Sequence, residues 1–97
     1  MAFTDSEIAE AHEAVRKQGD SDNLYKLGLI YSTGQGGAVD YVQAHMWFNL
    51  AASQLSASEK EKRDMAVKNR DLIAAKMTPA QLAEAQRLAR EWRPKKN

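Results

Sequence analysis

The chain of 97 residues contains no cysteine and only two prolines. The lack of cysteine excludes disulfide bonds and thiolate chemistry, and it leaves the redox compartment undetermined. With so few prolines, five glycines and many alanine, leucine, glutamate and lysine residues, the composition favours helices over strands. No segment approaches the ~18 consecutive apolar residues of a membrane-spanning helix, and the acidic start MAFTDSEIAE lacks the features of a secretory signal. We therefore expect a cytoplasmic all-α protein without a membrane partner.

The length of the chain predicts one domain, residues 1–97. Such a chain hides about 65% of its unfolded surface, which is enough for a modest core. The formal net charge of +1 conceals an acidic excess in residues 1–20 and a basic excess in residues 56–97. This polarity makes head-to-tail self-association possible. A solvated helix face and a basic tail explain the same pattern more simply.

Helix start and stop signals predict five helices. They cover about residues 5–18, 22–33, 41–54, 57–76 and the segment from 79 to just before Pro94. The expected N-caps are Thr4, Asp40, Ser56 and Thr78, and the expected glycine stops are Gly19 and Gly34. Thr4 with Glu7 and Thr78 with Gln81 have the spacing of capping boxes.

Apolar and small residues recur at helical spacing and predict how the helices pack. The second and third helices carry one stripe each: Leu24, Leu27, Gly28 and Tyr31, and then Ala44, Trp47, Phe48, Ala51 and Ala52. Gly28 is small where a partner backbone has to come close, and Trp47 is expected to be buried between the second and fourth helices. The fourth helix is expected to bury Met65, Ala66, Leu72 and Ile73. Asn69 lies on the same stripe, so we expect it to bond a turn backbone if it is buried.

The order of these residues resembles a known repeat. The resemblance rests on Leu27, Gly28, Tyr31, Gly34, Gly36, Asp40, Ala44, Trp47, Ala51 and Ala52, and it is to the Sel-like (Sel-one) repeat, a relative of the ~34-residue tetratricopeptide repeat. Asn23, Gly37 and Leu55 depart from the family pattern. The resemblance implies a right-handed α/α superhelix of about five antiparallel helices. It places one full repeat at about 22–55 and a closing helical hairpin at about 57–93, with partial flanking units.

The residues do not form a set that could carry catalysis. The glycine-rich turn at 34–37 follows a helix and lacks a complete phosphate-loop pattern. His12 and His45 have no carboxylate or second histidine at i±3 or i±4, so we interpret both as surface or half-buried residues. The carboxylates lie in charged runs rather than in apolar surroundings. We therefore predict no enzyme, no catalytic residue, no metal site and no cofactor.

The resemblance implies a protein-interaction scaffold without a catalytic centre. The first helix of each pair in such a scaffold lines the concave groove, and the second helix has more apolar residues than one neighbour covers. We predict a docking surface for another protein or peptide at Lys26, Leu29, Ile30 and Thr33. The alternative is that Leu29 and Ile30 are sandwiched between neighbouring helices.

A second functional hypothesis concerns the basic C-terminal helix. Arg87, Arg90 and Arg93 are spaced by three, and Lys95 and Lys96 follow them. A coherent basic face would suit a small nucleic-acid-associated protein. We favour nucleic acid less than a protein partner, because Trp92, which lies among these residues, is more typical of a core anchor.

Overall fold

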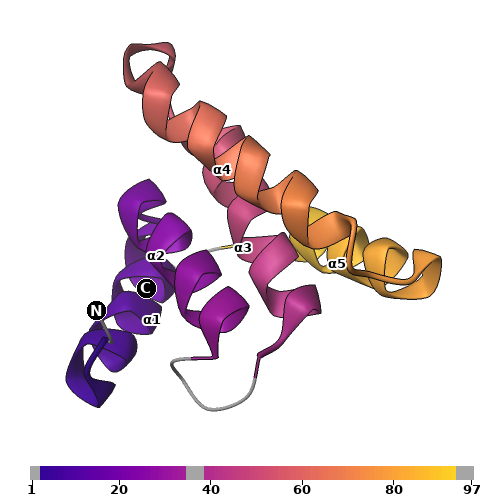
Figure 1. The fold of residues 1–97 in the computed structure, drawn as a ribbon. Coiled ribbons are helices and arrows are strands. Elements are labelled where there is room, and N and C mark those ends of the chain that lie inside the picture. Colours follow the sequence, from indigo (N-terminus) through magenta and orange to yellow (C-terminus); the bar gives the residue numbers. More distant parts are fainter. Residues whose placement is uncertain (1–2, 35–38, 94–97) are drawn as a thin grey trace.

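The computed structural model describes residues 3–34 and 39–93 of the chain, and all the regular structure within these ranges is helical (Figure 1). The elements are α1 (Asp5–Gln18), α2 (Ser21–Thr33), α3 (Tyr41–Gln54), the 3₁₀ turn η1 (Ala57–Glu59), α4 (Lys60–Ala74) and α5 (Pro79–Glu91). This confirms the prediction of an all-α chain with five α-helices. The predicted glycine turn, with Gly36 and Gly37, lies outside the described residues.

Local signals in the sequence explain where four of the helices begin and end. The Thr4 hydroxyl accepts a hydrogen bond from the Glu7 amide at 3.1 Å, and the Thr4 amide donates to the Glu7 carboxylate at 2.9 Å. Thr78 and Gln81 form the same capping box at the start of α5. Gly34 ends α2 at φ 75°, in the left-handed region that favours glycine. These contacts satisfy backbone groups that a helix end leaves unpaired.

The start of α4 differs from the prediction. Ser56 makes no side-chain cap, because its hydroxyl lies 2.7 Å from the hydroxyl of Ser58. The chain passes through the 3₁₀ turn η1 first, and α4 itself begins at Lys60 and ends at Ala74. The predicted cap at Ser56 is therefore wrong, and α4 is shorter at both ends than expected.

Helix α3 is the central element of the fold. It packs against α2, α4 and α5, while α1 packs against α2 (Figure 1). The sequence of α3 contains no charged residue, and half of its residues are buried: Ala44, His45, Met46, Trp47, Phe48, Leu50 and Ala51. A helix that is apolar around most of its circumference is stable only inside a core. Both α4 and α5 therefore cover α3.

The crossing of α2 and α3 leaves no room for a side chain on Gly28. A Cβ atom at this position would lie 2.6 Å from two ring carbons of Phe48, well inside van der Waals contact. Phe48 is itself 1% exposed, so its ring has little room to move away. This confirms that Gly28 is small because another helix comes close.

Trp47 is buried, as predicted, but its aromatic neighbours come from other elements than expected. Its ring centroid lies 6.2 Å from that of His12 in α1 and 6.2 Å from that of Trp92, the residue that ends α5. Both ring pairs are close to perpendicular, which is a favourable arrangement for aromatic groups. Trp47 thus joins α1 and the end of α5 to the core rather than only α2 and α4.

Candidate functional site

One face of α4 carries large apolar side chains that no other helix covers. Met65 is 52% exposed and Leu72 is 57% exposed, although the sequence predicted that both would be buried. Helix α3 packs instead on the neighbouring face of α4, where Ala66 and Ile73 are buried. Adjacent residues of a helix lie about 100° apart, so covering Ala66 and Ile73 leaves Met65 and Leu72 at the edge of the contact.

Two cavities lie between this face of α4 and helix α2. The first has a volume of about 260 Å³ and is lined by Asp22, Tyr25, Leu55, Lys62 and Met65. The second has a volume of about 290 Å³. Its lining includes Leu29, Ser32 and Thr33 from α2, Leu72 and Ile73 from α4, and Phe48 from α3. We call the two cavities together the α2–α4 groove.

A hydrogen bond separates the two cavities of the α2–α4 groove. The side-chain amide of Asn69 in α4 donates to the hydroxyl of Tyr25 in α2 at 2.9 Å. The Tyr25 ring rests on Phe48, with centroids 5.5 Å apart. The sequence predicted a bond to a turn backbone for a buried Asn69, but Asn69 is half-buried and its side-chain amide bonds the opposite helix. Its bond to Tyr25 spans α2 and α4.

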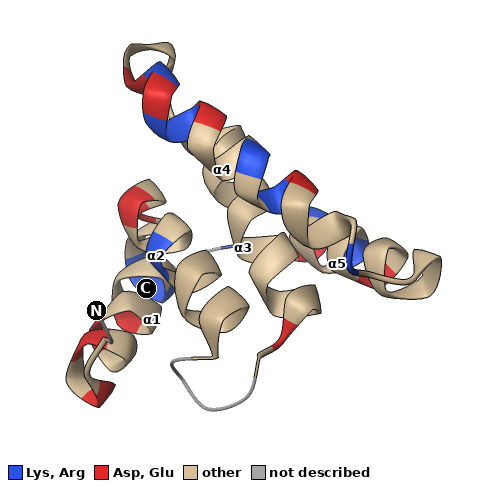
Figure 2. Cartoon of the chain, viewed as in Figure 1, with Lys and Arg blue, Asp and Glu red and all other residues tan. Residues whose placement is uncertain are grey.

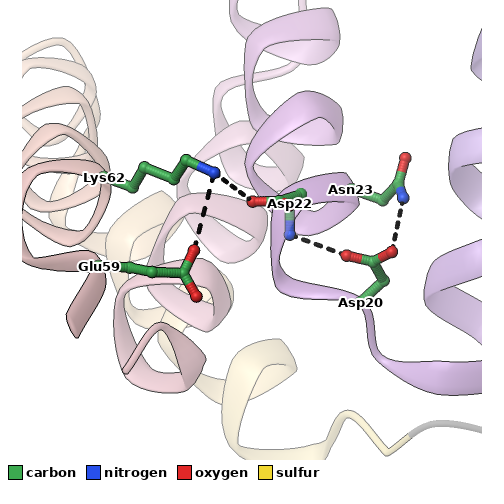
Figure 3. Close-up of polar contacts among 5 residues, drawn as sticks. All are labelled: Asp20, Asp22, Asn23, Glu59 and Lys62. Carbon is green, nitrogen blue, oxygen red and sulfur yellow. Dashed lines mark hydrogen bonds and ion pairs between the residues drawn. The ribbon is translucent and has the colours of Figure 1, made fainter. Parts of the chain in front are cut away.

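At the first cavity one lysine faces two carboxylates. Lys62 Nζ lies 3.1 Å from Asp22 Oδ1 and 3.7 Å from Glu59 Oε2, so it links α4 to the start of α2 (Figure 3). Asp22 is the main reason why the pKa of Lys62 is raised, with a smaller contribution from Glu59. Asp20, in turn, caps α2 through the Asp22 amide at 3.0 Å (Figure 3). The lysine is therefore already paired.

The second cavity has an unbalanced positive charge. Lys76 follows the end of α4 and lines this cavity. Its Nζ lies 5.8 Å from the centroid of the Tyr41 ring, within reach of a cation–π contact. Among residues 3–34 and 39–93, Lys76 has no carboxylate within ion-pair distance. The two ends of the groove thus differ in charge.

The four predicted docking residues do not form a single surface. Leu29 is half-buried and Thr33 is exposed, and both border the second cavity. Ile30 is fully buried in a core cluster that includes Ala11 and Val15 of α1, so its prediction as a docking residue is corrected. Lys26 is half-buried, and its Nζ lies 5.8 Å from the ring centroid of Phe3 beside α1. Only Leu29 and Thr33 belong to the groove.

The basic C-terminal helix offers less free charge than its sequence indicates. Arg87 bonds the carboxylates of Glu84 and Glu91, each at 2.8 Å. Arg93 donates to the backbone carbonyls of Arg90 and Trp92 at 3.0 and 2.6 Å. Acidic and basic residues also alternate along α4 (Figure 2). Ion pairs therefore neutralise Arg87, while Arg90 and Arg93 have no ion pair among the described residues. Lys95 and Lys96 lie outside the described residues.

The two histidines occupy different environments. His12 is half-buried, as expected, and its Nε2 lies 3.1 Å from the Tyr31 hydroxyl. His45 is only 4% exposed, which corrects its interpretation as a surface or half-buried residue. Burial lowers the pKa of both rings, and for His45 the positive charge of Arg70 lowers the pKa further, against a smaller opposing effect of Asp71. Both rings are therefore neutral near pH 7.

The part of the chain that the structure describes lacks a cluster of metal-binding side chains and a helix that could span a membrane. That part contains no group of three or more histidine, aspartate or glutamate residues placed to share a metal ion. None of its helices combines the length and the apolar character needed to cross a membrane.

Comparison with known proteins gave no match: no family model, no curated protein and no solved structure matches the chain. The resemblance of residues 22–55 to the Sel-like repeat therefore stays a prediction that rests on the residues themselves.

Proposed function

We propose that this protein is a non-catalytic protein-interaction module that binds another protein or peptide in the α2–α4 groove. The observation that carries the proposal is the exposure of Met65 and Leu72, more than half exposed on one face of α4. Each of them borders a cavity whose opposite wall is α2. Large apolar side chains beside concave surface are typical of binding sites.

The repeat resemblance supports the same surface independently. In an α/α superhelix of this class, the first helix of each pair lines the concave side. If residues 22–55 are one repeat and α4 opens the next unit, these first helices are α2 and α4. We also propose that the helices form a right-handed superhelix, with a docking surface that consists of Leu29, Thr33, Met65 and Leu72.

Peptide selection with the intact chain tests the proposal. Peptides selected from a displayed library should shift the NMR amide signals of α2 and α4 around Leu29, Thr33 and Leu72. Leu72→Glu should abolish binding, because it places a charge at an apolar contact. The matched control is Lys68→Glu, on the same helix at an exposed position with no ion pair among the described residues.

The contrary outcomes are equally specific. Binding that Leu72→Glu leaves unchanged would refute the groove as the docking surface. If single-stranded or duplex oligonucleotides instead shift Arg87, Arg90 and Arg93, and modest salt removes the effect, the basic helix carries the function.

A further inference from the structure

The two exposed apolar side chains that border the cavities lie on one face of α4, seven residues apart. Met65 and Leu72 are seven residues apart on α4, which corresponds to about 10 Å along the helix axis. Each borders its own cavity. Two side chains at i and i+7 of an incoming helix are also about 10 Å apart. On an extended peptide, side chains on one face are about 7 or 13 Å apart, which matches the rise between Met65 and Leu72 less well.

The hydrogen bond between Asn69 and Tyr25 forms a ridge between the two cavities, and it limits the size of a side chain that lies over it. The hydrogen bond between Asn69 and Tyr25 stands four residues after Met65 and three before Leu72. An incoming helix places residue i+3 or i+4 at this level, between its two apolar anchors. A small residue there lets the helix approach the ridge closely, as small residues do at other helix crossings.

The charge of the groove distinguishes its two ends. Lys62, at the first cavity, is paired with Asp22 and Glu59. Lys76, at the second cavity, has no carboxylate partner in the described part of the chain. The end of α4 contributes roughly half a negative charge nearby, which the full charge of Lys76 exceeds. Of the two lysines that line the cavities in the described part of the chain, Lys76 is therefore the one free to attract a carboxylate of the partner, four residues, or about one turn, beyond Leu72.

From these observations we infer that the α2–α4 groove binds one amphipathic helix of another protein. The helix carries apolar side chains at i and i+7 and a small residue at i+3 or i+4. Asp or Glu lies one turn beyond the anchor at the second cavity, which is i+10 or i+11 in a helix that runs in the same direction as α4, the direction that we propose. The inference rests on the proposed docking function and adds the chemistry of the partner. Helix-in-groove recognition uses anchors with this kind of spacing, and the carboxylate sets the direction in which the helix lies.

Selection of 15-residue peptides on three forms of the intact chain tests this inference. The parent chain should enrich the pattern above, with Asp or Glu at i+10 or i+11. Lys76→Glu should enrich Lys or Arg at the same position and keep both apolar anchors. The matched control, Lys68→Glu, should enrich the parent pattern. We expect an acidic peptide selected on the parent to bind Lys76→Glu about fivefold more weakly, and added salt should reduce this difference.

Thermal melting of each form shows whether the fold is retained, and Lys76→Gln provides a second variant without charge reversal. If groove-bound peptides show no acidic preference and bind parent and Lys76→Glu equally, the inference fails while the docking function stands. Apolar anchors at i and i+2, or signals in the groove that change only with the concentration of the chain itself, would also overturn it. If no selected peptide binds the groove, both the inference and the docking function are wrong.

Discussion

Helix α2 contacts α3 and α4 in opposite ways. Against α3, Gly28 lies directly on the buried ring of Phe48, and no space is left between them. Against α4, the described polar contacts are one hydrogen bond, between Asn69 and Tyr25, and one ion pair, between Lys62 and Asp22, with a cavity beside each. One contact is closed and apolar, and the other is open and polar.

The difference shows how one helix serves both stability and binding. Burying a large apolar side chain stabilises a fold by about 1.5–3 kcal/mol. A hydrogen bond contributes about 1 kcal/mol net, and an exposed ion pair contributes less. The contact with α3 therefore holds α2 in place. The contacts with α4 mainly keep the two helices apart at a fixed distance, which leaves room for a partner.

The largest effect is expected for Trp47, on the closed side of the molecule. Trp47→Ala should lower the free energy of unfolding by roughly 3–5 kcal/mol, because the cavity cannot be filled by α1 and α5. The indole N–H is buried and has no acceptor among the described residues, so Trp47→Phe loses no hydrogen bond and should cost much less. Urea unfolding of the two variants measures the difference. Equal losses for alanine and phenylalanine would mean that ring packing is not what Trp47 contributes.

The next largest loss of stability is expected at the α2–α3 crossing. Gly28→Leu should cost about 3 kcal/mol, at the upper end for overpacking, because its side chain collides with Phe48. Combining Gly28→Ala with Phe48→Leu should give a smaller loss than the sum of the single changes, since the smaller side chain makes room. Urea midpoints of the three variants test this. Additive losses would place Gly28 away from Phe48.

The smallest loss of stability is expected for the contact between α2 and α4. Tyr25→Phe and Asn69→Ala should each cost about 1 kcal/mol, and the double variant should cost less than the sum, because both remove the same hydrogen bond. Peptide binding should change more than stability in these variants, since the ridge between the cavities is lost. Losses as large as those at Gly28 would show that the α2–α4 contact is also part of the stabilising core.

Much of the fold could be predicted because its signals are local. Capping at Thr4 and Thr78 and the left-handed turn at Gly34 involve neighbours within a few residues, so the bounds of α1, α2, α3 and α5 follow closely from the sequence. At the start of α4 the local signals compete. The Ser56 hydroxyl pairs with Ser58 instead of the helix, and no pattern distinguished these options in advance.

The α2–α4 groove was only partly predictable from the sequence, because it depends on which faces of the helices pack together. Leu29 and Thr33 were found because α2 has apolar residues beyond its main stripe. Helical periodicity could not show that α1 covers Ile30, nor that α3 meets α4 on the side of Ile73 instead of Leu72. Both outcomes depend on the angles at which helices cross, which spacing along one helix does not contain.

The buried ring of His45 makes the balance between folded and unfolded chains sensitive to acid. The unfolded chain takes up a proton on this ring near pH 6.5, while burial and Arg70 keep the folded ring neutral to lower pH. As the pH falls below about 6.5, His45 binds a proton in the unfolded form but not in the folded form, so the free energy of unfolding decreases. Above that pH, the ring is neutral in both the folded and the unfolded chain, so His45 causes no loss of stability.

His45 lines a cavity with residues from α3, α4 and α5, including Asn49, Arg70 and Leu82. Protonation of His45 therefore favours unfolding of a chain in which this ring lies at the junction of α3, α4 and α5. Urea unfolding at pH 5 and pH 7.5 should show this loss of stability, and His45→Gln should reduce it to the part contributed by His12 and by carboxyl groups with a lowered pKa, such as Glu7 and Glu13. Acidity would then weaken the support of the groove through a residue that no docked partner touches.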